Sequence, residues 1–184
     1  CASNGSIELG VTGPSFSIAT ACSSASDACG YAFEAIRRGS VDFLLMGGAE
    51  ASIYPGILAA FCVARAISTR NEAPETASRP FTLDGDGFVL GEGAGMLVLE
   101  EYEHAKARGA KIYAEVLGFG MSADAYHMTA PLEDGDGARR CMLAAIKSAQ
   151  INPDQINYVN SHGTSTPLGD LAETKAEIDK WGVN

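Results

Sequence analysis

A short apolar stretch from Ser15 to Ala21 ends at Cys22 and passes directly into a helical pattern. Apolar and small residues then recur at the spacing of one helix face: Ala25, Ala28, Cys29, Ala32, Phe33 and Ile36. Gly39 supplies a helix stop. The pattern predicts a strand that turns into a helix, with Cys22 at the turn.

At the first turn of such a helix, a cysteine faces backbone N–H groups without partners and the positive end of the helix dipole, which favour the thiolate form. A thiolate in this place is a plausible nucleophile. The alternative is a structural cysteine, because free cysteines are among the most buried residues. The remaining cysteines have neither disulfide nor zinc spacing, so position favours Cys22: Cys1, Cys29, Cys62 and Cys141.

Beyond the first helix, apolar runs alternate with helical patterns. Strands are expected at residues 42–46, 96–99, 111–118 and 156–160, and helices at 101–108, at 137–150 and from Pro167 onward. Residues 54–67 indicate a short helix or a loop. This alternation predicts an α/β fold with a mostly parallel sheet.

The composition limits the class of protein. With 46% hydrophobic and 20% charged residues, the chain is typical of a globular protein. No apolar run approaches the roughly 18 residues that a membrane span needs, so we predict a cytoplasmic protein without membrane contact. The net charge of −10 argues against nucleic acid as a partner.

His162 follows the predicted strand 156–160 and is surrounded by hydroxyl side chains. Ligands bind at the carboxyl ends of parallel strands, although a lone histidine there is more often structural or on the surface. His127 lies in a predicted loop, and its role stays open between functional and structural. The segment 91–95 lacks dinucleotide-binding spacing, and the repeated Asp-Gly pairs lack the pattern of a calcium loop, so neither a nucleotide cofactor nor a metal is expected.

Motifs along most of the chain resemble those of the β-ketoacyl-acyl carrier protein synthases of type II fatty acid synthesis. They are Gly13-Pro14-Ser15, Thr20 to Ser24, Gly47 to Glu50, Asp86 to Gly95, Asp124 to Thr129 and His162 to Asp170. The resemblance implies a partial thiolase-like α/β fold with an αβαβα layered architecture. Residues 1–109 would be the later part of its first half, with the nucleophile, and 110–184 the start of its second half, with the first catalytic histidine.

The resemblance also assigns roles to individual residues. Cys22 matches the nucleophile that takes the acyl group, and His162 matches a histidine that assists malonyl decarboxylation. The matches to substrate-binding residues are Phe61 in the acyl pocket, Thr164 and Thr166 at the phosphopantetheine arm, and Thr129 in a loop at the active-site mouth. Arg65 matches a contact with the carrier protein. The residues expected in a supporting network are Asp124, Asp170 and Glu173, the last two beside the family's catalytic lysine.

The implied reaction is decarboxylative Claisen condensation of an acyl-enzyme thioester with malonyl-acyl carrier protein. The enzyme would be a homodimer with no cofactor of its own, because phosphopantetheine arrives on the carrier protein. The family's lysine, second histidine and glycine-rich loop are expected beyond Asn184, so we expect this chain alone to be inactive. Thr82 and Gly85 replace an aspartate and an arginine of the family, so the sequence does not predict an ion pair near Asp86. The alternatives are a ketosynthase domain of a polyketide synthase and a non-catalytic partner subunit.

Overall fold

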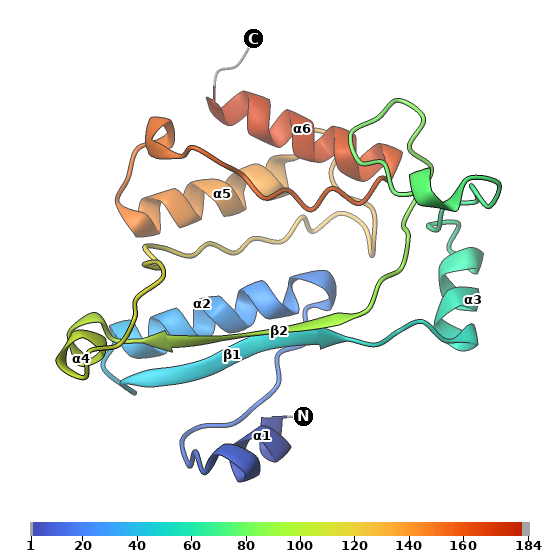
Figure 1. The fold of residues 1–184 in the computed structure, drawn as a ribbon. Helices are drawn as coiled ribbons and strands as arrows, with labels where there is room; N and C mark the ends of the chain where they lie inside the picture. Colours follow the sequence, from blue (N-terminus) through green and yellow to red (C-terminus); the bar gives the residue numbers. More distant parts are fainter. Residues whose placement is uncertain (1, 182–184) are drawn as a thin grey trace. The chain divides into compact units, whose positions relative to one another are not determined.

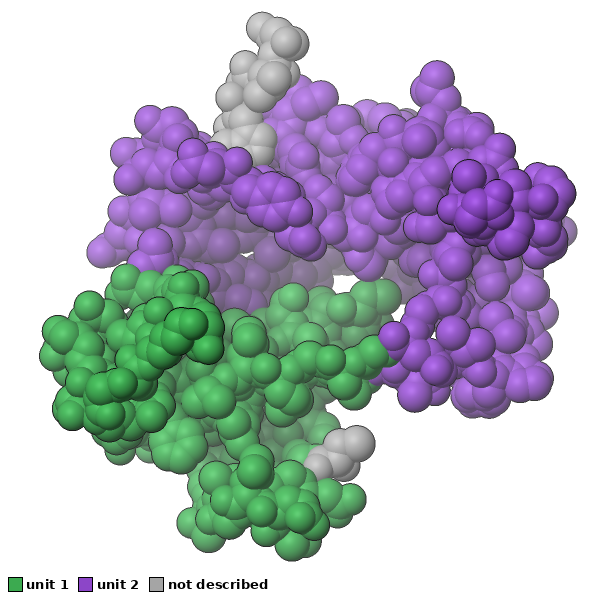
Figure 2. All heavy atoms as spheres, viewed as in Figure 1, with its two compact units in different colours: residues 1–49, 93–116 green, residues 50–92, 117–184 purple. Residues whose placement is uncertain are grey.

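The computed structural model describes residues 2–181, which divide into two compact units. Unit 1 contains the described residues up to 49 together with 93–116, and unit 2 contains residues 50–92 and 117–181 (Figure 2). Each unit is therefore built from two separate stretches of the chain.

Unit 1 is built around helix α2, Ser24–Arg37, which begins and ends where the periodicity predicts. Gly39 ends it in a left-handed conformation with φ of +69°, and its N–H donates to Ile36 O at 2.8 Å. The other elements of unit 1 are α1 (Ala2–Leu9), the 3-10 helix η1 (Ala21–Ser23), β1 (Phe43–Glu50), β2 (Gly93–Glu100) and α4 (Tyr102–Ala107). Helix α1 was not expected; most of its residues are small or polar and none is buried, so the sequence shows no apolar helix face there.

Strands β1 and β2 form a two-stranded sheet and run in opposite directions (Figure 1). The N–H of Glu101 donates to Asp42 O at 2.8 Å, which joins the end of one strand to the start of the other. The expected parallel arrangement is therefore wrong for this pair. Strand β1 also continues through Gly48, where a Cβ would lie 2.8 Å from Ala25 Cβ of α2. This glycine permits the helix to approach the strand, rather than ending the strand.

Unit 2 is mainly helical. Its elements are α3 (Pro55–Val63), the 3-10 helix η2 (Pro74–Thr76), α5 (Asp136–Ala149), the 3-10 helix η3 (Pro153–Gln155) and α6 (Pro167–Trp181). Helices α5 and α6 pack against each other, and Ile146, Ala172 and Ala176 are buried. Pro167 opens α6 as the sequence predicts. Within residues 2–181, no helix combines the length and apolar character needed to cross a membrane.

The strands expected at 15–21, 111–118 and 156–160 are not formed; β1 and β2 are the only strands within the described residues. A strand needs a neighbour for its backbone groups, and these segments make no ladder with another segment of the described chain. Residues 117–121 instead run along α5, where a Cβ at Gly118 would lie 2.5 Å from Ala145 O. The apolar runs gave no information about a pairing partner, and most of their residues are exposed in the structure.

Candidate active site

Cys22 lies in unit 1, on a sharp turn between an extended segment and α2. The turn is the 3-10 helix η1, and Cys22 is exposed. The preceding residue, Ala21, has φ of +54°, a left-handed conformation that residues with a Cβ seldom adopt. The backbone at Ala21 is therefore strained, and the next residue, Cys22, is exposed just before the start of α2.

Hydroxyl side chains hold this turn. Ser24 Oγ donates to Ala21 O at 2.7 Å and accepts from the N–H of Thr20 at 2.9 Å. Ser23 Oγ lies 2.9 Å from Thr20 O. The hydroxyl groups of Ser23 and Ser24 therefore lie within hydrogen-bond distance of backbone groups of Thr20 and Ala21, next to the left-handed residue.

A cavity of about 300 Å³ lies within unit 2. Six of the residues that the resemblance singled out line it: Asp124, Thr129, His162, Thr164, Thr166 and Glu173. Apolar side chains of Phe88, Pro131 and Leu132 complete part of the wall. Residues from a loop, an extended segment and helix α6 thus line one cavity. The expected meeting of Cys22 with His162 stays a prediction, since Cys22 belongs to unit 1.

The backbone of His162 is fixed by Glu173. One carboxylate oxygen of Glu173 accepts from the N–H of His162 at 2.5 Å, and the other accepts from the N–H of Gly163 at 2.9 Å. Gly163 has φ of +53°, which suits glycine. The carboxylate on α6 therefore positions the histidine segment directly, a role that the sequence did not indicate.

The two threonines point their hydroxyl groups toward each other. Thr164 Oγ1 and Thr166 Oγ1 are 2.7 Å apart, on the cavity wall. Ser165 between them is buried, with 1% of its surface exposed and φ of +64°. Its N–H donates to Asp170 at 3.1 Å, and Asp170 also accepts from the N–H of Phe81 at 2.7 Å. Asp170 thus joins the segment 163–166 to the loop that carries Phe81.

The loop 124–132 is closed by its own polar contacts. Asp124 Oδ2 accepts from the N–H of Leu132 at 3.0 Å. His127 Nδ1 accepts from the N–H of Thr129 at 3.2 Å and of Ala130 at 3.0 Å. His127 therefore stabilises the turn that carries Thr129, which gives this histidine a structural role.

Phe61 and Arg65 lie in and just after helix α3. The Phe61 ring packs edge to face on Phe88 at 5.7 Å between centroids, and Phe88 lines the cavity. Arg65 is exposed and has φ of +54°. Among the described side chains, none forms an ion pair with Arg65, so its charge is available to a partner.

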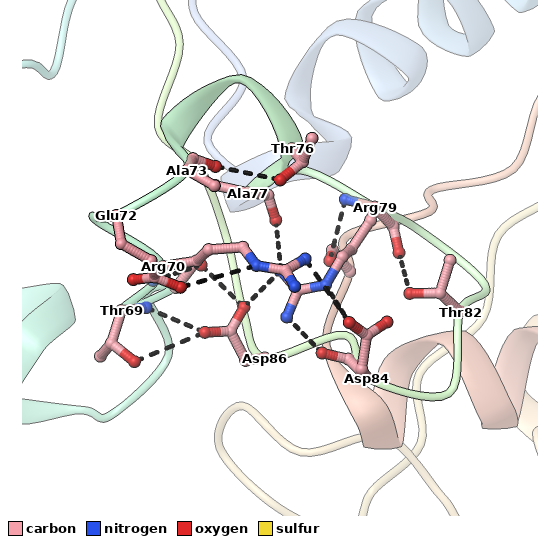
Figure 3. Close-up of polar contacts among 12 residues, drawn as sticks. Thr69, Arg70, Glu72, Ala73, Thr76, Ala77, Arg79, Thr82, Asp84 and Asp86 are labelled. Carbon is pink, nitrogen blue, oxygen red and sulfur yellow. Dashed lines mark hydrogen bonds and ion pairs between the residues drawn. The ribbon is translucent and has the colours of Figure 1, made fainter.

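An ion-pair network surrounds Asp86, where the sequence did not predict one (Figure 3). Arg79 Nη1 lies 2.9 Å from Asp86 Oδ1, and Arg79 Nε lies 3.2 Å from Asp84 Oδ2. The Ser68 hydroxyl donates to Asp86 at 2.7 Å and the N–H of Thr69 donates at 2.9 Å. These hydrogen bonds, Ser68 first, together with Arg79, lower the pKa of Asp86 to about 2. Arg79 was missed because an arginine in a polar loop has no periodic signal.

No group of three or more metal-binding side chains occurs in the part of the chain that the structure describes. The second Asp-Gly repeat begins in a turn at Asp134 and runs into α5 at Asp136. Asp136 pairs with Arg139 at 2.5 Å and Arg140 at 2.6 Å. These arginines lower the pKa of Asp136, Arg140 contributing most.

Comparison with known proteins gives consistent results along the whole chain. Residues 1–105 match the beta-ketoacyl synthase N-terminal domain, and residues 113–180 match the beta-ketoacyl synthase C-terminal domain. The chain is 57% identical over 174 residues to the 3-oxoacyl-[acyl-carrier-protein] synthase 2 of Vibrio cholerae, covering 95% of this chain and 42% of the relative. It is 50% identical over 177 residues to the enzyme of that name from Staphylococcus aureus, covering 96% and 44%. The chain thus spans less than half of these relatives.

Solved structures give the same assignment. A type II polyketide ketosynthase in complex with its acyl carrier protein, AntDE:AntF, matches with a TM-score of 0.92 and 40% identity, covering 98% of this chain and 45% of that one. A beta-ketoacyl synthase from Burkholderia phymatum matches with a TM-score of 0.83 and 48% identity, covering 88% and 39%. The predicted partial thiolase-like fold is confirmed, and the chain belongs to the beta-ketoacyl synthase family.

Proposed function

We propose that the protein containing this chain is a 3-oxoacyl-acyl carrier protein synthase, which extends acyl chains in fatty acid synthesis. The observation that carries the proposal is Cys22, exposed at a strained turn at the start of α2. An accessible thiol in this position exchanges readily with a thioester. The identity to synthases of that name, 57% over 174 residues, supports the same chemistry.

In the first step, the Cys22 thiolate attacks the acyl thioester of a carrier protein, and the carrier thiol leaves. In the second, the bond between the malonyl carboxylate and its α-carbon breaks, releasing carbon dioxide and leaving the electron pair as an enolate. That carbon attacks the acyl carbonyl, a carbon–carbon bond forms, and the Cys22 sulfur leaves as thiolate. The products are a β-ketoacyl-carrier protein, carbon dioxide and free enzyme, so no redox step is involved.

His162 is proposed to donate a hydrogen bond to the oxygen that becomes negative in the enolate. Glu173 accepts hydrogen bonds from the backbone N–H groups of His162 and Gly163. These bonds fix the backbone that carries the imidazole. The paired hydroxyls of Thr164 and Thr166 are proposed to bind the phosphopantetheine arm of the carrier protein. Their place on a cavity wall that is otherwise largely apolar fits a narrow chain with a few amide groups.

Phe61 is proposed to limit the acyl pocket, because it packs on a phenylalanine of the cavity wall. Arg65 is proposed to contact the acidic carrier protein, since it is exposed and positively charged. We further propose that the whole protein is a homodimer, which sedimentation would test. Asp170 and Asp124 support the site by accepting backbone N–H groups of its loops.

The proposal is tested in the full-length protein with an acyl-carrier protein donor. Mass spectrometry of the peptides should find the acyl group on Cys22, and Cys22→Ala should abolish the β-ketoacyl product. The matched control is Cys62→Ala, because Cys62 is a second exposed cysteine on helix α3. Acylation of another cysteine, or product formation by Cys22→Ala, would contradict the proposed function.

A polyketide ketosynthase is the second candidate, favoured by the structural match to the AntDE:AntF complex at 40% identity. The condensation step is the same, but the product differs. A fatty acid condensing enzyme releases its β-ketoacyl-carrier protein after one extension. A polyketide ketosynthase instead repeats the extension without reduction of the keto group. Product analysis with excess malonyl-carrier protein and no reductase therefore separates the two. A non-catalytic subunit is disfavoured by the exposed Cys22.

A further inference from the structure

Asp27 is a buried acidic residue in the first turn of helix α2, for which neither the sequence pattern nor the family resemblance supplies a role. Only 7% of its surface is exposed. Burial of a carboxylate is unfavourable unless hydrogen bonds replace its water. No basic side chain of the described residues forms an ion pair with it. Its partners are therefore hydroxyl groups.

These hydroxyl groups come from both sides of Cys22. Thr20, two residues before the cysteine, donates its hydroxyl to Asp27 Oδ2. Ser23, the residue after it, places its hydroxyl 3.1 Å from the same oxygen and 3.0 Å from the Thr20 hydroxyl. One carboxylate oxygen thus contacts a residue on each side of Cys22.

The turn needs such support, because Ala21 has a left-handed φ of +54°. Without it, the backbone would relax toward a conformation that L residues prefer, and Cys22 would move with it. Asp27 can oppose this relaxation, since it holds Thr20 on one side of Ala21 and Ser23 on the other. Its own position is fixed by helix α2.

We propose that Asp27 is a positioning residue for the nucleophile: through Thr20 and Ser23 it holds the strained turn that presents Cys22 to the thioester. The inference rests on the proposed function, in which Cys22 accepts the acyl group. Because Asp27 acts through the geometry of the turn, its removal should slow the acyl-transfer step rather than weaken donor binding.

The test measures acylation of Cys22 in the full-length protein, from an acyl-carrier protein donor, by rapid quench and mass spectrometry. Asp27→Ala should lower the rate constant at saturating donor by about tenfold or more, with the half-saturating donor concentration changed less than about threefold. Asp27→Asn keeps an acceptor oxygen and should recover most of the rate. The matched control is Glu34→Ala, two turns farther along α2, which removes an exposed ion pair with Arg37.

A second pair of variants changes Thr20 and leaves the buried Asp27 side chain in place. Thr20→Val removes the hydroxyl but keeps the shape, whereas Thr20→Ser keeps the hydroxyl, so the first should be slow and the second close to wild type. Equal acylation rates in wild type, Asp27→Ala and Thr20→Val would overturn the inference. It would also be overturned if Thr20→Ser were as slow as Thr20→Val. Failure of the wild-type protein to acylate Cys22 would instead refute the proposed function.

Discussion

The contact between Glu173 and the histidine segment gives the sharpest prediction for the cavity. Its carboxylate accepts from the N–H of His162 at 2.5 Å and from the N–H of Gly163 at 2.9 Å. Glu173→Ala removes both acceptors. A hydrogen bond to a charged group contributes about 1.5–3 kcal/mol when water cannot replace it. His162 is exposed and Gly163 is only half-buried, so we expect a total loss near 1–2 kcal/mol in the free energy of unfolding.

The effect on catalysis should be larger than the effect on stability. If His162 shifts by a fraction of an ångström, the hydrogen bond to the enolate oxygen loses its alignment, and a displacement of 1 Å can cost on the order of a hundredfold in rate. Glu173→Gln keeps one acceptor oxygen and should fall between wild type and Glu173→Ala. The assay is the condensation rate at saturating substrates in the full-length protein, alongside urea unfolding.

Glu177→Ala is the matched control for this prediction. Glu177 lies one turn farther along α6 and accepts the Ser161 hydroxyl at 2.8 Å, next to His162 but without touching its backbone. This variant should lose a similar bond and keep the rate within about threefold. If both variants slowed the reaction equally, or if Glu173→Ala left the rate unchanged, the positioning role of Glu173 would be refuted.

The remaining predictions concern acid stability, packing and partner binding. The pKa of Asp86 is about 2, below the ordinary value near 4, so its contribution to stability is complete above about pH 4 and disappears as the pH falls toward 2. Asp86→Asn should therefore lose stability at pH 5, roughly half as much at pH 3 and little at pH 2, measured by urea unfolding. Gly137→Ala places a Cβ on the Asp124 carboxylate and should destabilise the protein by about 1–3 kcal/mol in the same assay. Arg65→Glu should raise the KM for the carrier protein about tenfold at low salt without changing kcat, whereas the exposed control Lys147→Glu should not.

The helices were predictable because the sequence patterns that specify a helix lie within the helix itself and the residues next to it. Apolar positions at the spacing of one helix face and a following glycine predicted α2, and Pro167 predicted the start of α6. The strands were less predictable, because pairing joins distant residues. The run 156–160 has the composition of a buried strand but makes no ladder within the described residues, while β1 extends through glycines that indicated a stop.

The cavity residues were predicted by family resemblance rather than by periodicity. His162, Thr164 and Thr166 follow an extended segment, and the resemblance attached roles to them, which stay predictions. All three line the same cavity. Asp27 and Arg79 were missed for a physical reason. An aspartate in the first turn of a helix is sufficiently explained by the helix dipole, and its burial against two hydroxyls is visible only in three dimensions.

Strained backbone next to candidate site residues is accompanied by aspartates, of which Asp27 and Asp170 are buried. Three residues with a Cβ and a positive φ adjoin candidate site residues: Ala21 before Cys22, Ala125 after Asp124, and Ser165 between Thr164 and Thr166. Such conformations cost about 1–3 kcal/mol each and persist only where other contacts enforce them. In each case an aspartate that accepts hydrogen bonds is at hand, namely Asp27, Asp124 and Asp170. Because these carboxylates oppose relaxation of the turns, their loss should displace functional side chains first, and only secondarily unfold the protein.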